Sequence, residues 1–112
     1  MKYRHYAPAA PLVLLSGNEA DVLRYLQTEA ASRKCAILCY DEECEALAGG
    51  ILFPVGKKDD LTKQAHRLFA ALREADGTDA EIIYAHLPPQ DGLGLALYNR
   101  LIRAAAHTVK EV

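Results

Sequence analysis

One stretch indicates the fold class: residues 35–40, Cys-Ala-Ile-Leu-Cys-Tyr. This stretch carries no charge and has the length of one buried strand. Similar apolar runs occupy residues 11–15, 51–55 and 80–85. Strands that are apolar at nearly every position are typical of a sheet covered on both faces. Pro54 cannot donate a ladder hydrogen bond, so we expect the third strand at an edge of the sheet.

Segments with helical spacing separate these runs. Ser16 or Asn18 is expected to cap the first helix, because short polar side chains accept hydrogen bonds from free amides at helix starts. Asp59 or Asp60 is expected to cap the helix with the clearest apolar stripe. We expect that helix to stop at an Asp-Gly pair, residues 76–77.

The remaining segments complete an alternation of strand and helix. Residues 41–48 predict a short acidic helix, residues 93–106 predict the last helix, and residues 109–112 are interpreted as a short tail. Four repeats of strand and helix indicate an α/β domain, with a parallel sheet of about four strands and helices on both faces in three layers.

Composition excludes several classes of function. The chain has 112 residues, which fits one domain, and a net charge of −2 without a stripe of Lys and Arg. We therefore expect no direct binding of nucleic acid. No apolar run approaches the roughly 20 residues of a membrane span, and the first residues lack the apolar core of a signal peptide. We expect no membrane association and a cytoplasmic location.

Three cysteines, Cys35, Cys39 and Cys44, lie close together in the sequence. Their spacing does not match a Cys-x-x-Cys metal motif, so we expect no metal site. Strand alternation places Cys35 and Cys39 on one face as small core residues, whereas Cys44 lies in an acidic, more exposed stretch.

Four loops follow the predicted strands, at residues 16–18, 40–42, 56–59 and 86–94. In open parallel sheets, ligands favour the loops beyond the carboxyl ends of the strands. Chemistry is therefore expected where these loops meet. No Ser or Cys can be placed beside His86, so no nucleophilic centre is predicted.

Gly92 and Gly94 open the last helix and allow two interpretations. Free amides at a helix start can bind an anion. The alternative is a tight turn that brings the helix close to the sheet, and it is favoured because Leu97 replaces the third glycine of a dinucleotide motif. Asn99 and Arg100 follow on the same helix, where Arg100 is expected either to clamp an anion or to tie down a neighbouring loop.

The first ten residues differ from the rest and are predicted to form an extended arm, residues 1–10, ahead of a domain at residues 11–112. Five consecutive residues of the arm concentrate positive charges, hydrogen-bond donors and aromatic rings: Lys2, Tyr3, Arg4, His5 and Tyr6. Such a segment suits a nucleotide, with Lys2 or Arg4 near phosphate. The alternative is a flexible terminus with no partner, and it is favoured on the residues alone.

Five blocks of sequence, in order along the chain, resemble one known family. They are residues 1–8 (Met-Lys-Tyr-Arg-His-Tyr-Ala-Pro), 10–14 (Ala-Pro-Leu-Val-Leu), 60–61 with 68–73 and Asp76, 92–94 (Gly-Leu-Gly) with Ala96, and 99–101 (Asn-Arg-Leu). The first two blocks together closely resemble the interdomain linker of two-domain threonylcarbamoyl-AMP synthases of the Sua-five type. The other three blocks continue the resemblance along the chain. In that family Ser-Pro-Gly commonly precedes this methionine, so Met1 is expected to be internal to a longer chain.

The resemblance implies a function for the whole enzyme. Such enzymes make threonylcarbamoyl-adenylate and pyrophosphate from ATP, L-threonine and bicarbonate, for the threonylcarbamoyladenosine modification of tRNA. An N-terminal YrdC-like domain performs the chemistry with ATP and magnesium, and it is the expected partner of this chain. The C-terminal domain is a Rossmann-like accessory unit, without a cofactor of its own and inactive alone. The five arm residues inherit the family linker's role of gating the catalytic cleft.

Two positions depart from the family pattern. His86 stands where an acidic residue is expected, and Ala9 replaces a lysine. Both departures leave the fold in place. Two other functions compete with the accessory role: an independent nucleotide-binding α/β domain, and a protein-interaction module that forms a homodimer through an exposed helix face.

Overall fold

The computed structural model describes residues 8–112 as one α/β unit built around a five-stranded parallel sheet in the order β3-β2-β4-β1-β5. The order of elements along the chain is β1 (Leu12–Ser16), α1 (Glu19–Ser32), β2 (Cys35–Cys39), a 3-10 helix η1 (Asp41–Glu43), β3 (Ile51–Pro54), α2 (Leu61–Asp76), β4 (Ile82–His86), α3 (Gly92–Ala104) and β5 (Val109–Glu111). The prediction of a three-layer α/β fold is confirmed.

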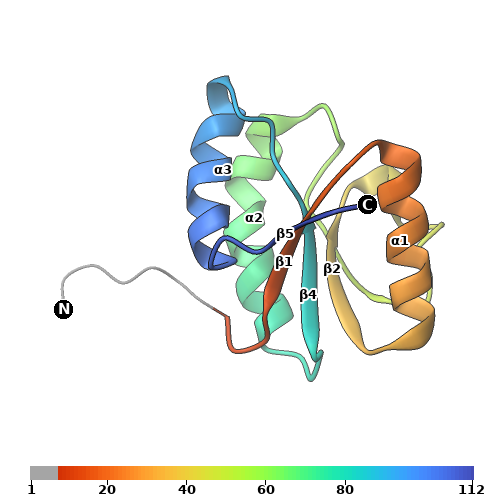
Figure 1. Ribbon diagram of the computed structural model, residues 1–112. Helices are drawn as coiled ribbons and strands as arrows, with labels where there is room; N and C mark the ends of the chain where they lie inside the picture. Colours follow the sequence, from red (N-terminus) through yellow and green to blue (C-terminus); the bar gives the residue numbers. More distant parts are fainter. Residues whose placement is uncertain (1–7) are drawn as a thin grey trace.

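The helices cover the sheet unequally. Figure 1 shows α1 alone on one face, whereas α2 and α3 lie side by side on the other. The connection from β1 to β2 runs toward one edge of the sheet, whereas those from β3 to β4 and from β4 to β5 run toward the opposite edge. Right-handed crossovers in opposite directions place their helices on opposite faces.

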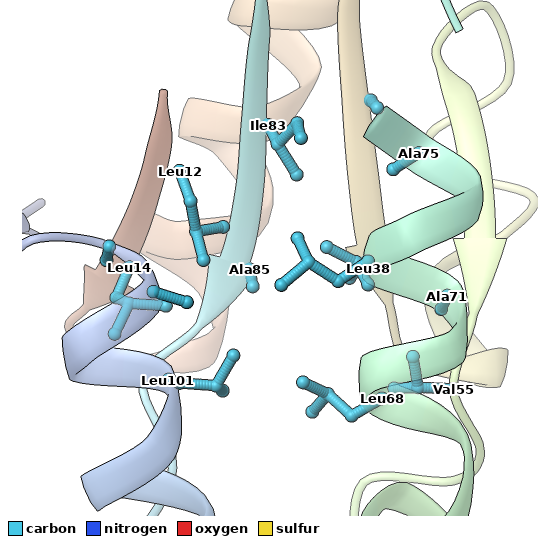
Figure 2. Close-up of a cluster of buried hydrophobic side chains, with 14 of the residues drawn as sticks. Leu12, Leu14, Leu38, Val55, Leu68, Ala71, Ala75, Ile83, Ala85 and Leu101 are labelled. Carbon is cyan, nitrogen blue, oxygen red and sulfur yellow. The ribbon is translucent and has the colours of Figure 1, made fainter. Parts of the chain in front are cut away.

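Each face of the sheet has its own core. Ala36 and Leu38 of β2 point to the core under α2 and α3, whereas Cys35, Ile37 and Cys39 point to the core under α1. The prediction that the two cysteines share a face is therefore confirmed. Figure 2 shows the aliphatic side chains of the α2/α3 core meeting between the two helices and the strands.

Both predicted helix caps form, each through one of the two residues considered. Asn18 Oδ1 accepts a hydrogen bond from the Asp21 amide at 2.9 Å. Asp60 Oδ1 accepts one from the Lys63 amide at 3.0 Å. Helix α2 ends at Asp76 before Gly77, as predicted, and β3 is an edge strand.

Two predictions were wrong in detail. The tail contains β5, which pairs in parallel with β1 through Leu14 and Val109. Its side chains are all exposed, so it carries no apolar signal. The acidic helix is only one turn long: η1 ends at Glu43, turns follow at residues 44–47, and Leu47 enters the core under α1. In the described part of the chain, no helix is long and apolar enough to cross a membrane.

Candidate functional site at the strand ends

A cavity of about 570 Å³ lies at the carboxyl ends of β1, β2 and β4. All four loops predicted to meet there contribute to its wall, through Ser16 to Glu19, Tyr40, Lys58 with Asp59, and His86 with Leu87 and Pro89. The prediction from fold class is confirmed to this extent: the loops after the strands enclose one hollow.

The topology explains why the hollow forms at this place. Strands β1 and β4 are neighbours, but β1 leads to α1 on one face and β4 leads to α3 on the other. The two loops therefore separate above the strand ends and leave a crevice. This is the position at which open α/β sheets bind their ligands.

His86 is held rigidly in the wall of the cavity. Its Nε2 lies 2.8 Å from Glu43 Oε1, and only 12% and 11% of the two side chains are exposed. The ring of Tyr40 stacks on the imidazole, with centroids 4.1 Å apart and planes 10° from parallel. Because a carboxylate only accepts hydrogen bonds, Nε2 carries the proton of this contact.

Tyr40 and Glu43 support each other as well as His86. The Tyr40 amide donates to Glu43 Oε1 at 2.9 Å, which fixes the carboxylate between backbone and imidazole. Burial raises the pKa of Tyr40 to about 12, with the nearby Glu43 carboxylate adding to the effect. The phenol therefore stays neutral near pH 7 and can donate a hydrogen bond.

An ion pair links the two sides of the cavity. Lys58 Nζ, from the loop before α2, lies 2.6 Å from Glu19 Oε2, at the start of α1. Helix α2 fixes this loop, because Gln64 Nε2 donates to the carbonyls of Lys57 and Lys58 at 2.8 and 3.0 Å. The Lys58 amide also donates to the Glu42 carboxylate, at 3.2 and 3.3 Å to its two oxygens.

The glycine motif of α3 lies beside the cavity and does not line it. A Cβ on Gly94 would lie 2.6 Å from the carbonyl oxygen of Pro89, so this glycine permits a close approach of helix and loop. Gly92 has a φ of +54° and open space around it. Asn99 is exposed, and the Arg100 guanidinium lies 4.0 Å from the centre of the Phe69 ring, between α3 and α2.

The predicted gating residues Lys2, Tyr3, Arg4, His5 and Tyr6 lie outside the described residues. The end of the arm is described, and it lies at the opposite end of the strands from the cavity. The amides of Ala9 and Ala10 donate to Asp76 Oδ1 at 2.8 and 3.4 Å, at the C-terminal end of α2.

Sequence reasoning missed two residues of the site, Glu43 and Gln64. Both are buried polar side chains with their hydrogen bonds satisfied. Glu43 had a detectable signal, since it stands three residues after Tyr40, the spacing of a capping box. Gln64 had none, because its partners are backbone carbonyls of a loop whose path the sequence does not specify.

Known proteins are similar to this chain in sequence and in architecture. A family model described as threonylcarbamoyl-AMP synthase, C-terminal domain, matches residues 1–106. The threonylcarbamoyl-AMP synthase of Bacillus subtilis is 33% identical over 110 residues, which cover 97% of this chain and 32% of that protein. The chain thus spans about a third of the length of the curated relatives it matches.

Two solved structures match as well. The Sua5 protein of Pyrococcus abyssi, crystallised with L-threonine, has a TM-score of 0.77 and 32% identity, over all of this chain and 33% of that one. A C-terminal Sua5 domain from Pyrococcus horikoshii, with 21% identity and a TM-score of 0.62 over 95% of this chain and all of that one, shows the same fold. The chain therefore belongs to the family of threonylcarbamoyl-AMP synthase C-terminal domains.

Proposed function

We propose that this chain is the accessory domain of a threonylcarbamoyl-AMP synthase. The whole protein would make threonylcarbamoyl-adenylate and pyrophosphate from ATP, L-threonine and bicarbonate, for tRNA modification in the cytoplasm. The observation that carries the proposal is the family match over residues 1–106, in relatives about three times as long. The remaining two thirds of such a protein has room for a YrdC-like catalytic domain.

The proposal divides the chain into an arm, residues 1–10, and an accessory domain, residues 11–112. The arm would lie over the catalytic cleft of the N-terminal domain and control access to it, through Lys2, Tyr3, Arg4, His5 and Tyr6. The contacts of Ala9 and Ala10 with Asp76 support this division, because they anchor the last arm residues to the domain and fix where the arm leaves it.

ATP and magnesium belong to the catalytic domain in this proposal. Within residues 8–112, no three His, Cys, Asp or Glu side chains gather into a possible metal site. The loop after β1 reads Ser16-Gly17-Asn18-Glu19 and lacks the glycine spacing of a dinucleotide motif. The residues of this chain would position the arm and exclude water from the partner's cleft.

A deletion experiment tests the accessory role. The full-length protein, its catalytic domain alone and this chain alone are compared by pyrophosphate release with ATP, L-threonine and bicarbonate. We expect turnover by the full-length protein only. Full activity of the catalytic domain without arm and domain would overturn the proposal.

Substitutions in the arm test the gate. In the full-length protein, Arg4→Ala and the double change His5→Ala with Tyr6→Ala should each reduce turnover at least tenfold, whereas Lys34→Ala, at an exposed pair with Asp79, should not. Wild-type rates in both arm variants would show that the arm has no gating role. Light scattering of the same samples over a range of concentrations decides whether the protein forms a homodimer.

A further inference from the structure

The Glu19–Lys58 pair has an unusual position for a surface ion pair. The two residues come from elements on opposite faces of the sheet, and both line the cavity at the strand ends. Their side chains are 69% and 46% exposed. Exposed pairs of this kind contribute little to stability, so opening this one costs the fold little.

The charges around the pair restrict what can replace it. A purely anionic ligand on Lys58 would leave the Glu19 carboxylate unpaired beside it. A purely cationic ligand on Glu19 would leave the Lys58 ammonium unpaired. A ligand with both charges can enter between the two residues and pair with each, so that no charge is left without a partner.

Further groups of the cavity suit the same ligand. Asp59 lines the cavity and has no hydrogen bond or ion pair with residues 8–112, so it is a second acceptor for an ammonium group. The ring of His86 forms its one hydrogen bond at Nε2, and no buried side-chain nitrogen or oxygen in the described chain lacks a partner. Nδ1 is therefore open to solvent, in a residue that lines the cavity, and can form a hydrogen bond with a ligand.

The wall also has an apolar part. It is formed by side chains from all three layers of the domain, which are Leu15, Val22, Leu61, Leu87 and Pro89. A single lysine and two acidic side chains at the rim disfavour a ligand with several negative charges, such as a nucleoside triphosphate. A volume of about 570 Å³ is within the usual range of small-molecule sites.

We propose that this cavity binds a small zwitterion, of the class of α-amino acids with an apolar side chain. The carboxylate of the ligand pairs with Lys58, and its ammonium group pairs with Glu19 and Asp59. The side chain lies against the apolar wall beside His86. This site goes beyond the accessory role and does not depend on it, because binding to the isolated chain needs no catalytic domain.

Titration calorimetry with the 112-residue chain tests the proposal. The probes are six amino acids, L-valine, L-leucine, L-isoleucine, L-methionine, L-phenylalanine and L-tyrosine. For an amino acid that binds, the two analogues with one charge are measured next; for L-phenylalanine these are 3-phenylpropionate and 2-phenylethylamine. We expect at least one amino acid to bind, and both of its analogues to bind about tenfold or more weakly.

Variants then locate the site. Lys58→Met should weaken binding about tenfold to a hundredfold, because it leaves the carboxylate of the ligand without its partner. Glu19→Gln should weaken binding less, by about tenfold, because Asp59 still pairs with the ammonium group. Lys57→Met is the matched control, since this exposed lysine does not line the cavity, and it should bind as the wild type does. Circular dichroism confirms that each variant is folded.

Three results would overturn the proposal. The first is no heat from any of the six amino acids at 10 mM, roughly a hundredfold above a useful dissociation constant. The second is equal binding of an amino acid and its carboxylate analogue. The third is equal loss of binding in the Lys57→Met control and the Lys58→Met variant.

Discussion

The two faces of the sheet are packed with different kinds of side chain. Under α2 and α3 the buried members of the hydrophobic core are all aliphatic, as Figure 2 shows for Leu12, Leu14, Leu38 and Leu101. Under the single helix α1 the core includes two cysteines and Tyr84. Tyr84 is 1% exposed, and its hydroxyl donates to Glu29 Oε1 at 2.5 Å.

This difference follows from the unequal numbers of helices that cover the two faces of the sheet. Two helices supply enough apolar area to bury their face without hydrogen bonds between side chains. One helix supplies less, and α1 is also held by polar contacts at its edge. Tyr25 Oη lies 3.4 Å from the Tyr84 hydroxyl, and Arg33, at the end of α1, pairs with Glu81. Stability should therefore depend on side-chain volume on the α2/α3 face and on hydrogen bonds on the α1 face.

The largest effect is expected in the aliphatic core. Leu72→Ala removes a fully buried side chain between α2 and the sheet, and should lower the free energy of unfolding by about 2–5 kcal/mol. Urea denaturation measures the change. Leu95→Ala, at a position 42% exposed on α3, is the control and should change stability by less than about 0.5 kcal/mol. Similar values for both would refute the assignment of this core.

Gly94→Ala tests the close approach of α3 to the loop before it. The added Cβ would lie 2.6 Å from the Pro89 carbonyl oxygen, so the helix must shift, at a cost of about 1–3 kcal/mol. Gly92→Ala is the comparison, because that site has space but a positive φ, and it should cost about 1 kcal/mol. Thermal unfolding of both variants gives the order. A larger loss at Gly92 would contradict the packing described.

On the α1 face, Tyr84→Phe tests the hydrogen bond to Glu29. The ring keeps its volume, but the largely buried carboxylate loses its donor, which should cost about 1–3 kcal/mol. Tyr25→Phe should cost less, because its hydroxyl makes only the longer 3.4 Å contact. Urea denaturation compares the two, and no loss in either variant would show that the tyrosines act through packing alone.

Alkaline pH should weaken the α1 face through Cys39. Burial raises the pKa of this thiol from 9.0 to about 12. A thiol with a raised pKa stays protonated in the folded chain while the unfolded chain loses its proton, so stability falls once the pH exceeds 9. The slope reaches about 1.4 kcal/mol per pH unit.

Unfolding curves at pH 8, 9 and 10, in a reducing agent, measure that slope. Cys39→Ala lowers stability at every pH but should give a flatter pH dependence than the wild type. Parallel pH dependences would show that Cys39 does not titrate differently in the folded chain.

The smallest effect is expected at the outer edge of the aliphatic face. Arg100→Gln removes the guanidinium that lies 4.0 Å from the centre of the Phe69 ring, and should cost about 0.5–1 kcal/mol. Arg100→Lys should recover part of the loss, because it restores the positive charge. Thermal unfolding at low ionic strength resolves the pair, and no change in either variant would assign Arg100 to solvent.

Most of the fold was predictable, because apolar runs, caps and stops are local signals. The four buried strands, the caps Asn18 and Asp60 and the edge position of β3 follow from neighbouring residues alone. The strand β5 was not predictable, since its exposed side chains pair only through the backbone with β1. Strand order depends on crossover directions, which no local pattern encodes.

The candidate site was predictable only in outline. Its loops follow from the parallel sheet, and His86 was noted at the end of its strand. The contact between His86 and Glu43 joins residues 43 positions apart, and that between Lys58 and Glu19 joins residues 39 positions apart. Such contacts depend on how β2, β4 and the two helices are placed, so they require the three-dimensional structure.

Helix α2 reaches both ends of the domain. Its first turns, with Leu61 and Gln64, line the cavity, and its last residue, Asp76, holds the amides of Ala9 and Ala10. Sixteen residues make a rod about 24 Å long. A tilt of this rod would move the wall of the cavity and the anchor of the arm together.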